Sequence, residues 1–101
     1  MGDDGRVAAI ARALAHPTRV HILRLLAAQT ECRGADVFGD LPLAQSTISE
    51  HLRILKDAGI VTSRPAGSGV VYCLAPDAFD DFIGAVTEIA NAHCLVERRG
   101  L

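Results

Sequence analysis

Residues 43–61 read LAQSTISEHLRILKDAGIV and are the most informative part of the sequence. Its apolar side chains recur at the spacing of one helix face, at Ile48, Leu52 and Leu55. This spacing predicts a helix over 45–58 with one face packed on a core and a polar face opposite. Gly59 follows directly and Lys56 lies in the last turn, and both are signals that end a helix.

The residues on either side of this helix predict a DNA-binding architecture. Two β-prone segments, 61–66 and 70–74, flank the turn Gly67-Ser68-Gly69, which predicts a β-hairpin. A brief helix is expected before the main one, over about 34–39. Two short helices joined by a tight turn and followed by a hairpin form a winged helix-turn-helix. The helix-turn-helix would span about 34–58, and the wing that follows it would span about 61–74.

The outer parts of the chain complete a single domain. Apolar spacing predicts further helices over 6–15, 17–28 and 76–97, and residues 30–32 are expected to form a short strand or a loop. Pro17 suits the first position of the second helix. We therefore expect residues 1–101 to form one mainly α domain with a small β-hairpin. The predicted order is helix, helix, strand, helix, helix, strand, strand, helix.

Composition limits the classes of protein that the chain can be. It has 101 residues, of which sixteen are alanine and 4% are aromatic, which favours small, closely packed helices over a sheet sandwich. Lys and Arg number 10 against 12 Asp and Glu, a net charge of −2, which excludes a globally basic nucleic-acid-binding protein. No apolar run approaches the roughly 20 residues of a membrane span, and the polar start is unlike an export signal. We expect a cytoplasmic protein that does not enter a membrane.

Three stretches resemble the ArsR/SmtB family of bacterial metal-sensing repressors. They are LAHPTRVHIL at 14–23, the helix and its flanks at 43–61, and GVVYCL at 69–74. The resemblance covers most of the chain and implies a homodimer formed through the first and last helices. It also implies two recognition helices in successive major grooves and release from the operator when an inducer binds. The broad apolar stripes of the first and last helices independently favour dimerisation.

The polar face of the 45–58 helix carries side chains of the kinds that read DNA. Gln can bind adenine, Arg can bind guanine through two hydrogen bonds, and Ser and Thr contact phosphates or either base. The candidate DNA-contacting residues, including two in the wing, are Gln45, Ser46, Thr47, Ser49, Glu50, His51, Arg53, Lys56, Arg64 and Ser68. The expected partner is double-stranded operator DNA with an imperfect inverted repeat, because a two-fold dimer reads two related half-sites.

Other functions fit the sequence less well. Three cations face two anions over 45–64, a net charge of +1, so we expect a moderate salt dependence of DNA binding. The polar face could instead be a merely solvated surface, or the domain could bind protein, although a polar recognition face argues against the latter. His51 is expected to pack or to approach phosphate rather than to bind metal. No catalytic motif is present, so we do not expect an enzyme.

Three cysteines are candidates for sensing an inducer. In a winged helix, the short strand before the third helix pairs with the second hairpin strand, which would place Cys32 and Cys73 on neighbouring strands. Two thiolates that close suit a thiophilic ion or a reversible disulfide. Cys94 in the last helix could add a third thiolate. Three thiolates would suit As(III) or Sb(III) as the inducer, with no constitutive cofactor.

The usual metal sites of the family are missing. Arg33 and Ala35 occupy the two positions of the Cys-x-Cys pair found in many arsenic sensors, and Ile83 stands where the zinc site of the last helix has a histidine. Cys32 and Cys94 resemble the cysteine pair of persulfide-sensing relatives, so a thiol-redox or persulfide response is the alternative. A third interpretation is that all three cysteines are small buried residues and that the inducer is not a metal.

Overall fold

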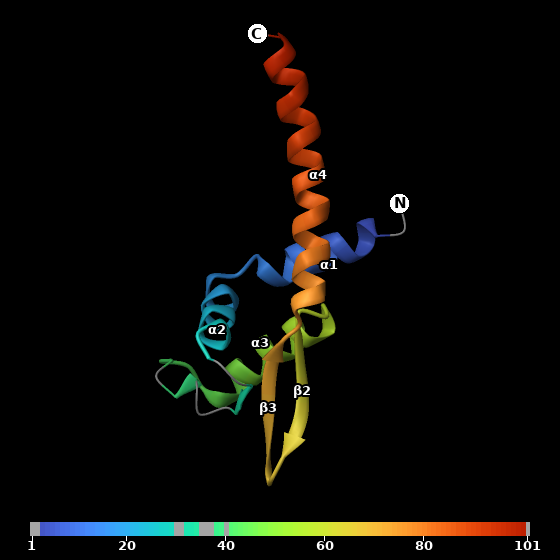
Figure 1. The fold of residues 1–101 in the computed structure, drawn as a ribbon. Helices are drawn as coiled ribbons and strands as arrows, with labels where there is room; N and C mark the ends of the chain where they lie inside the picture. Colours follow the sequence, from blue (N-terminus) through green and yellow to red (C-terminus); the bar gives the residue numbers. More distant parts are fainter. Residues whose placement is uncertain (1–2, 30–31, 35–37, 40, 101) are drawn as a thin grey trace.

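The computed structural model describes residues 3–29, 32–34, 38–39 and 41–100. Its elements are α1 (Asp4–Leu14), α2 (Pro17–Ala27), β1 (Arg33–Gly34), α3 (Gln45–Asp57), β2 (Val61–Ala66), β3 (Gly69–Leu74) and α4 (Pro76–Gly100). Figure 1 shows α4 rising away from the other helices, while the β2–β3 hairpin projects at the opposite end. The molecule is accordingly elongated, with extents of 58 × 27 × 24 Å. This arrangement is the expected winged helix-turn-helix.

The helix α3 forms and ends as its sequence predicts. Ile48, Leu52 and Leu55 are buried, so the apolar face packs on the core. At the end of the helix the backbone N–H of Ile60 donates to the carbonyl of Leu55 (3.2 Å), and that of Gly59 donates to Lys56 (2.9 Å). Gly59 has a φ of 85°, the left-handed conformation that this helix-ending motif requires.

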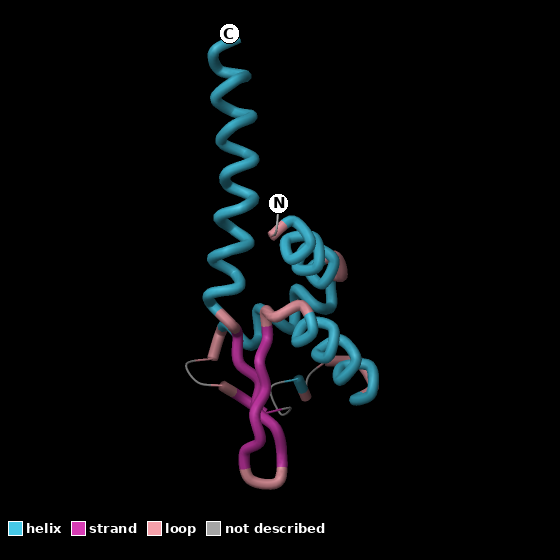
Figure 2. The backbone as a smooth tube through the Cα atoms, turned by 90° about the vertical axis from the view of Figure 1, so that its right-hand side faces the viewer, coloured by secondary structure: helices cyan, strands magenta, loops and turns pink. Residues whose placement is uncertain are grey.

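The wing is part of a small antiparallel sheet with the strand order β1-β3-β2. Ala66 pairs with Gly69, so the hairpin turn has two central residues, Gly67 and Ser68, instead of the three expected. Gly67 has a φ of 61°, which glycine adopts without steric cost. Figure 2 shows both strands extending beyond the helices, which makes the hairpin tip accessible.

The first strand lies later in the chain than the sequence indicated. Arg33 pairs with Tyr72 and Gly34 with Val71, so β1 is Arg33–Gly34 rather than a strand over 30–32. Residues 30 and 31 lie outside the described residues. The position of β1 is decided by pairing with β3, which local propensity cannot reveal. Because Gly34 is in the strand, the brief helix cannot begin there, and most of the remainder of that expected helix (35–37) also lies outside the described residues.

Helices from both ends of the chain build the core around α3. The buried apolar residues are Ile10, Ala13, Ile22, Leu23, Leu26, Phe38, Ile48, Leu52, Leu55, Ile60, Val61 and Ala78. The helix boundaries differ slightly from those expected. The helix α1 begins at Asp4 instead of residue 6, and α4 continues to Gly100 instead of ending near residue 97. No helix in the described part of the chain combines the length and the hydropathy that a membrane crossing requires.

Candidate nucleic-acid interface

The predicted DNA-contacting residues lie on α3 and on the hairpin. The exposed ones are Gln45, Ser46, Thr47, Ser49, Glu50, Arg53, Lys56, Arg64 and Ser68. Since the apolar face of α3 is buried, those that belong to α3 form the surface that this helix offers to a partner, whereas Arg64 and Ser68 lie on the hairpin. Their contact with DNA remains a prediction.

Arg53 is held between two acidic side chains of its own helix. Its Nε donates to both carboxylate oxygens of Glu50 (2.7 and 3.1 Å), and its Nη2 donates to Glu50 Oε2 (3.0 Å). Its Nη1 donates to Asp57 Oδ2 (2.7 Å). The Arg53 side chain is nevertheless 60% exposed, so the ion pairs lie on the surface. Asp57 is not among the predicted contact residues, although its spacing of four residues from Arg53 indicates such a pair.

These contacts shift the acid–base equilibria of the pair in the expected directions. The hydrogen bond from Arg53 lowers the pKa of Glu50, with the positive charge of Arg53 acting in the same direction. The hydrogen bond to Glu50 likewise raises the pKa of Arg53. Both groups therefore stay ionised at neutral pH, and the two acids offset much of the positive charge of α3.

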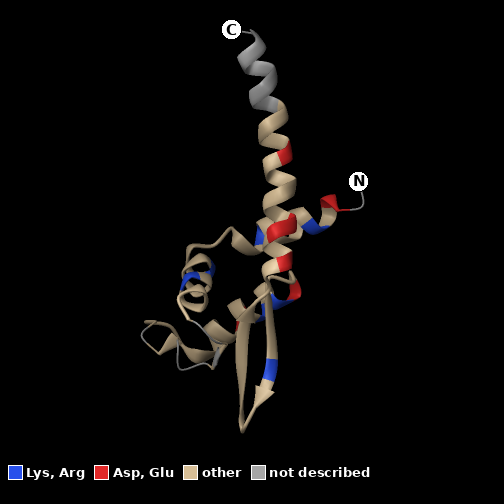
Figure 3. Cartoon of the chain, in the orientation of Figure 1, with Lys and Arg blue, Asp and Glu red and all other residues tan. Residues whose placement is uncertain are grey.

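The wing contributes little positive charge. Arg64 is exposed on β2 and pairs across the hairpin with Val71, while Ser68 is exposed in the turn. Figure 3 shows a single basic band on β2 and none on β3. Of the predicted contact residues, the wing therefore offers one cation, Arg64, and one hydroxyl, that of Ser68, which agrees with the modest charge of the sequence.

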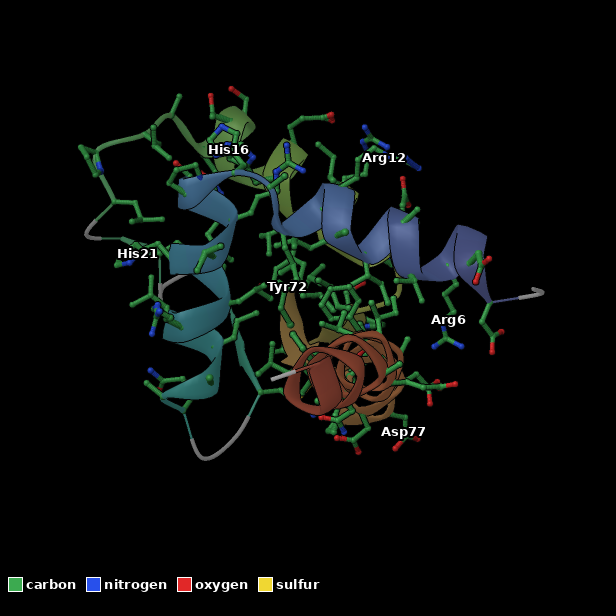
Figure 4. The ribbon with its side chains drawn as sticks, turned by 90° about the horizontal axis from the view of Figure 1, so that it is seen from above. Arg6, Arg12, His16, His21, Tyr72 and Asp77 are labelled. Carbon is green, nitrogen blue, oxygen red and sulfur yellow. A yellow bond between two sulfur atoms is a disulfide. The ribbon has the colours of Figure 1, made fainter. Side chains whose placement is uncertain are left out.

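His51 differs from the other candidates because it faces into the molecule. The centroids of the His51 and His16 rings lie 4.7 Å apart. His16 lies at the corner between α1 and α2 (Figure 4), where its Nδ1 accepts a hydrogen bond from the backbone N–H of Thr18 (3.2 Å). Partial burial lowers the pKa of His51, and the charges of His16 and Arg19 act in the same direction. The role of His16 as the N-cap of α2 was missed because histidine is not a typical capping residue.

The structure joins Cys32 and Cys73 in a disulfide. Cys32 directly precedes β1 and continues its register opposite Cys73, and the two Cα atoms lie 4.7 Å apart, the separation of facing residues in an antiparallel pair. A surface cavity of about 340 Å³ borders both cysteines and continues to Leu26 and Pro76. In this state the sulfur atoms are bonded to each other, so metal binding by this pair requires its reduction.

The third predicted thiolate of the metal site belongs to Cys94. The side chain of Cys94 lies outside the described residues, as does that of His93. Within the described residues, no three His, Cys, Asp or Glu side chains are grouped closely enough to hold a metal ion. A site that includes Cys94 therefore remains a prediction.

Apolar side chains stand exposed along α4. Phe79 and Phe82 pack partly against the core, but farther along the helix Ile83, Val86 and Ile89 are 57%, 44% and 69% exposed. The first part of α4 also meets α1, where Arg6 and Asp81 form an ion pair of 3.5 Å. The apolar stripe predicted from the sequence thus continues beyond what this chain itself covers.

Known proteins share both the sequence and the fold. The family described as "Bacterial regulatory protein, arsR family" matches residues 16–63. An uncharacterized HTH-type transcriptional regulator of Methanocaldococcus jannaschii is 38% identical over 84 residues, which make up 83% of this chain and 94% of that protein. The biofilm growth-associated repressor of Agrobacterium fabrum is 35% identical over 83 residues, covering 82% of this chain and 70% of that repressor.

A solved structure extends this similarity to three dimensions. The homodimeric winged helix-turn-helix DNA-binding domain of a possible ArsR-family regulator from Mycobacterium bovis has a TM-score of 0.67 and 30% identity, covering 88% of this chain and 82% of that domain. The fold and these relatives together define the class of the protein, a winged helix-turn-helix transcriptional regulator. The chain belongs to the arsR family of bacterial regulatory proteins.

Proposed function

We propose that this regulator is a homodimeric repressor that binds operator DNA through α3 and is released by a chemical change at Cys32 and Cys73. The exposed polar face of α3 supports the DNA-reading role, because its side chains are those that recognise base edges and phosphates. The single observation that carries the sensing role is the cysteine pair itself. It links the segment that leads into the helix-turn-helix to strand β3 of the wing.

The homodimer is supported by the uncovered apolar residues of α4. A monomer would leave Ile83, Val86 and Ile89 in water, and a second copy would remove them from it. Two copies related by a two-fold axis would present two α3 helices to an operator with an imperfect inverted repeat. The homodimeric relative from Mycobacterium bovis agrees with this arrangement.

A thiol–disulfide switch fits the geometry best, because the two cysteines are close enough to bond without moving the strands. On oxidation, the two thiols lose two protons and two electrons. A hydropersulfide can accept them, leaving as a thiol and hydrogen sulfide, while Cys32 and Cys73 form their bond. This bond fixes Cys32 to strand β3 of the wing. It would thereby change the position of α3 relative to the hairpin, and both would contact the same DNA.

Metalloid sensing is the second candidate, and the same close pair of sulfur atoms favours it. In the reduced protein, Cys32 and Cys73 would supply two thiolates to As(III) or Sb(III), and Cys94 would supply a third. Both candidate mechanisms use Cys32 and Cys73. They differ in the chemical species that causes release and in whether Cys94 is needed.

Fluorescence anisotropy of the protein on its own promoter DNA tests these proposals. We expect reduced protein to bind tightly, and a persulfide donor to weaken binding at least tenfold unless Cys32→Ser or Cys73→Ser is present. Cys94→Ser should still respond. Release by stoichiometric arsenite alone, lost in Cys94→Ser, would instead establish the metalloid sensor. Tight binding that neither reagent changes would place the inducer elsewhere, and absence of operator binding would overturn the repressor itself.

The cysteine variants need a stability control. The two cysteines are 41 residues apart in the sequence, and closing a loop of that length contributes about 4 kcal/mol to stability in the chain-entropy description. Thermal unfolding of reduced wild-type protein and of both serine variants should therefore give similar midpoints, below that of the oxidised protein. Variants that match the reduced protein in stability but not in response identify the switch.

A further inference from the structure

Arg53 retains two N–H groups that its acidic neighbours do not use. A guanidinium has five N–H donors. Glu50 accepts the one on Nε and one on Nη2, and Asp57 accepts one on Nη1, which accounts for three. The two that remain are one on Nη1 and one on Nη2. They lie in the same plane, and the exposed side chain leaves them accessible from solvent.

This pair of donors matches what guanine presents in the major groove. Guanine offers two acceptors there, O6 and N7, and a guanidinium binds them through two N–H groups at once. A free arginine samples many rotamers and must lose that freedom on binding. Arg53 is anchored by one carboxylate a turn before it and another a turn after it, so its guanidinium plane is oriented before DNA arrives.

The same carboxylates act against binding of the phosphate backbone. Phosphate contacts dominate non-specific affinity and carry no sequence information. Glu50 and Asp57 neutralise Arg53 and would repel phosphates that approach it. Their presence on a recognition face lowers the general attraction for DNA while leaving a directional hydrogen-bonding pair available.

We propose that Glu50 and Asp57 are positioning residues that hold Arg53 so that its two remaining N–H groups read one guanine of the operator instead of binding phosphate. This inference rests on the proposed function, and specifically on α3 being the DNA-reading helix. In this role Glu50 and Asp57 increase the sequence specificity of DNA binding instead of its affinity.

The test first locates the guanine. Affinities of wild-type protein and Arg53→Ala are measured for operator copies in which each G·C pair of a half-site is replaced by A·T. We expect one position where replacement weakens wild-type binding about tenfold to a hundredfold and leaves Arg53→Ala unchanged. At this position, Glu50→Gln with Asp57→Asn should reduce the discrimination to about threefold or less.

Two further readouts separate positioning from charge. In the double variant a released Arg53 would contact phosphate, so the slope of log affinity against log salt should steepen by about 0.9 on random DNA. Asp80→Asn, which removes an exposed acid of α4, is the matched control and should change neither the discrimination nor the slope. Circular dichroism would verify that α3 stays helical in every variant.

The outcomes distinguish this inference from the proposed function. Unchanged discrimination in the double variant, with equal gains in affinity for operator and random DNA, would overturn the positioning role alone. So would tight operator binding with no guanine position that depends on Arg53. Wild-type protein that does not prefer its operator over random DNA would overturn the proposed function, and this inference with it.

Discussion

The contact between His16 and His51 joins two residues that are 35 positions apart in the sequence. His51 belongs to α3 and His16 caps α2, so the contact links α3 to the corner that leads back to α1. The groups that face His51 are His16 and Arg19 from this corner and Glu50 from its own helix. Partial burial favours a neutral His51, and the electrostatic effects of His16 and Arg19 act in the same direction.

Stability should therefore fall when the solution becomes acidic. The pKa of His51 is lowered from 6.5, so between that value and the native one the unfolded chain binds more protons. This contribution to the free energy of unfolding is complete above about pH 6.5 and is lost as pH falls through the native pKa. Urea unfolding measures this effect at pH values from about 5 to about 8, on both sides of 6.5. As the pH falls, the free energy of unfolding should decrease less for His51→Gln than for wild type. Equal decreases in the two proteins would contradict the prediction.

Among the elements, α3 depends most on local signals. Its apolar spacing and its helix-ending glycine are both in the sequence, and both operate as predicted. The strand β1 shows the opposite case, because two residues pair with β3 at a position that their own propensities do not indicate. Local signals thus suffice for the long helices and the hairpin, but not for an element stabilised mainly by its partner.

Gly59→Ala should destabilise the protein by about 1–2 kcal/mol, because alanine is strained at a φ of 85°. A Cβ at this position would meet no atom within 4 Å, so the cost is conformational rather than steric. Gly5→Ala is the matched control, since Gly5 lies in α1 and has open space around it. Chemical denaturation measures the free energy of unfolding of both variants. A loss of stability in Gly5→Ala as large as that in Gly59→Ala would contradict this explanation.

At the scale of the whole molecule, α4 determines the shape and carries the exposed apolar surface. The helix leaves the body of the protein in Figure 1, and its apolar residues extend beyond the part that meets α1. Such a surface is better explained by a second chain than by solvent. In the proposed dimer, this contact would also set the distance between the two copies of α3 and with it the spacing of the operator half-sites.

Ile89→Glu should convert the proposed dimer into a monomer without unfolding the chain. Ile89 is 69% exposed in the single chain, so the carboxylate costs little there, but it would be desolvated in an interface. Asn91→Glu adds the same charge on the other side of α4 and should leave the dimer intact. Sedimentation equilibrium measures the oligomeric state of both variants. A dimeric Ile89→Glu would place the interface elsewhere.

Much of this protein can be read from local patterns in its sequence. The recognition helix with its terminal glycine, the hairpin and the long last helix follow from apolar spacing and turn residues, because these act over a few neighbouring positions. The close approach of Cys32 and Cys73 follows once the winged helix is assumed. What depends on the folded chain is how distant groups meet: the placement of β1, the His16–His51 contact, and which residues of the apolar stripe of α4 remain exposed. These arise from strand pairing and packing between segments far apart in the sequence, which no local pattern encodes.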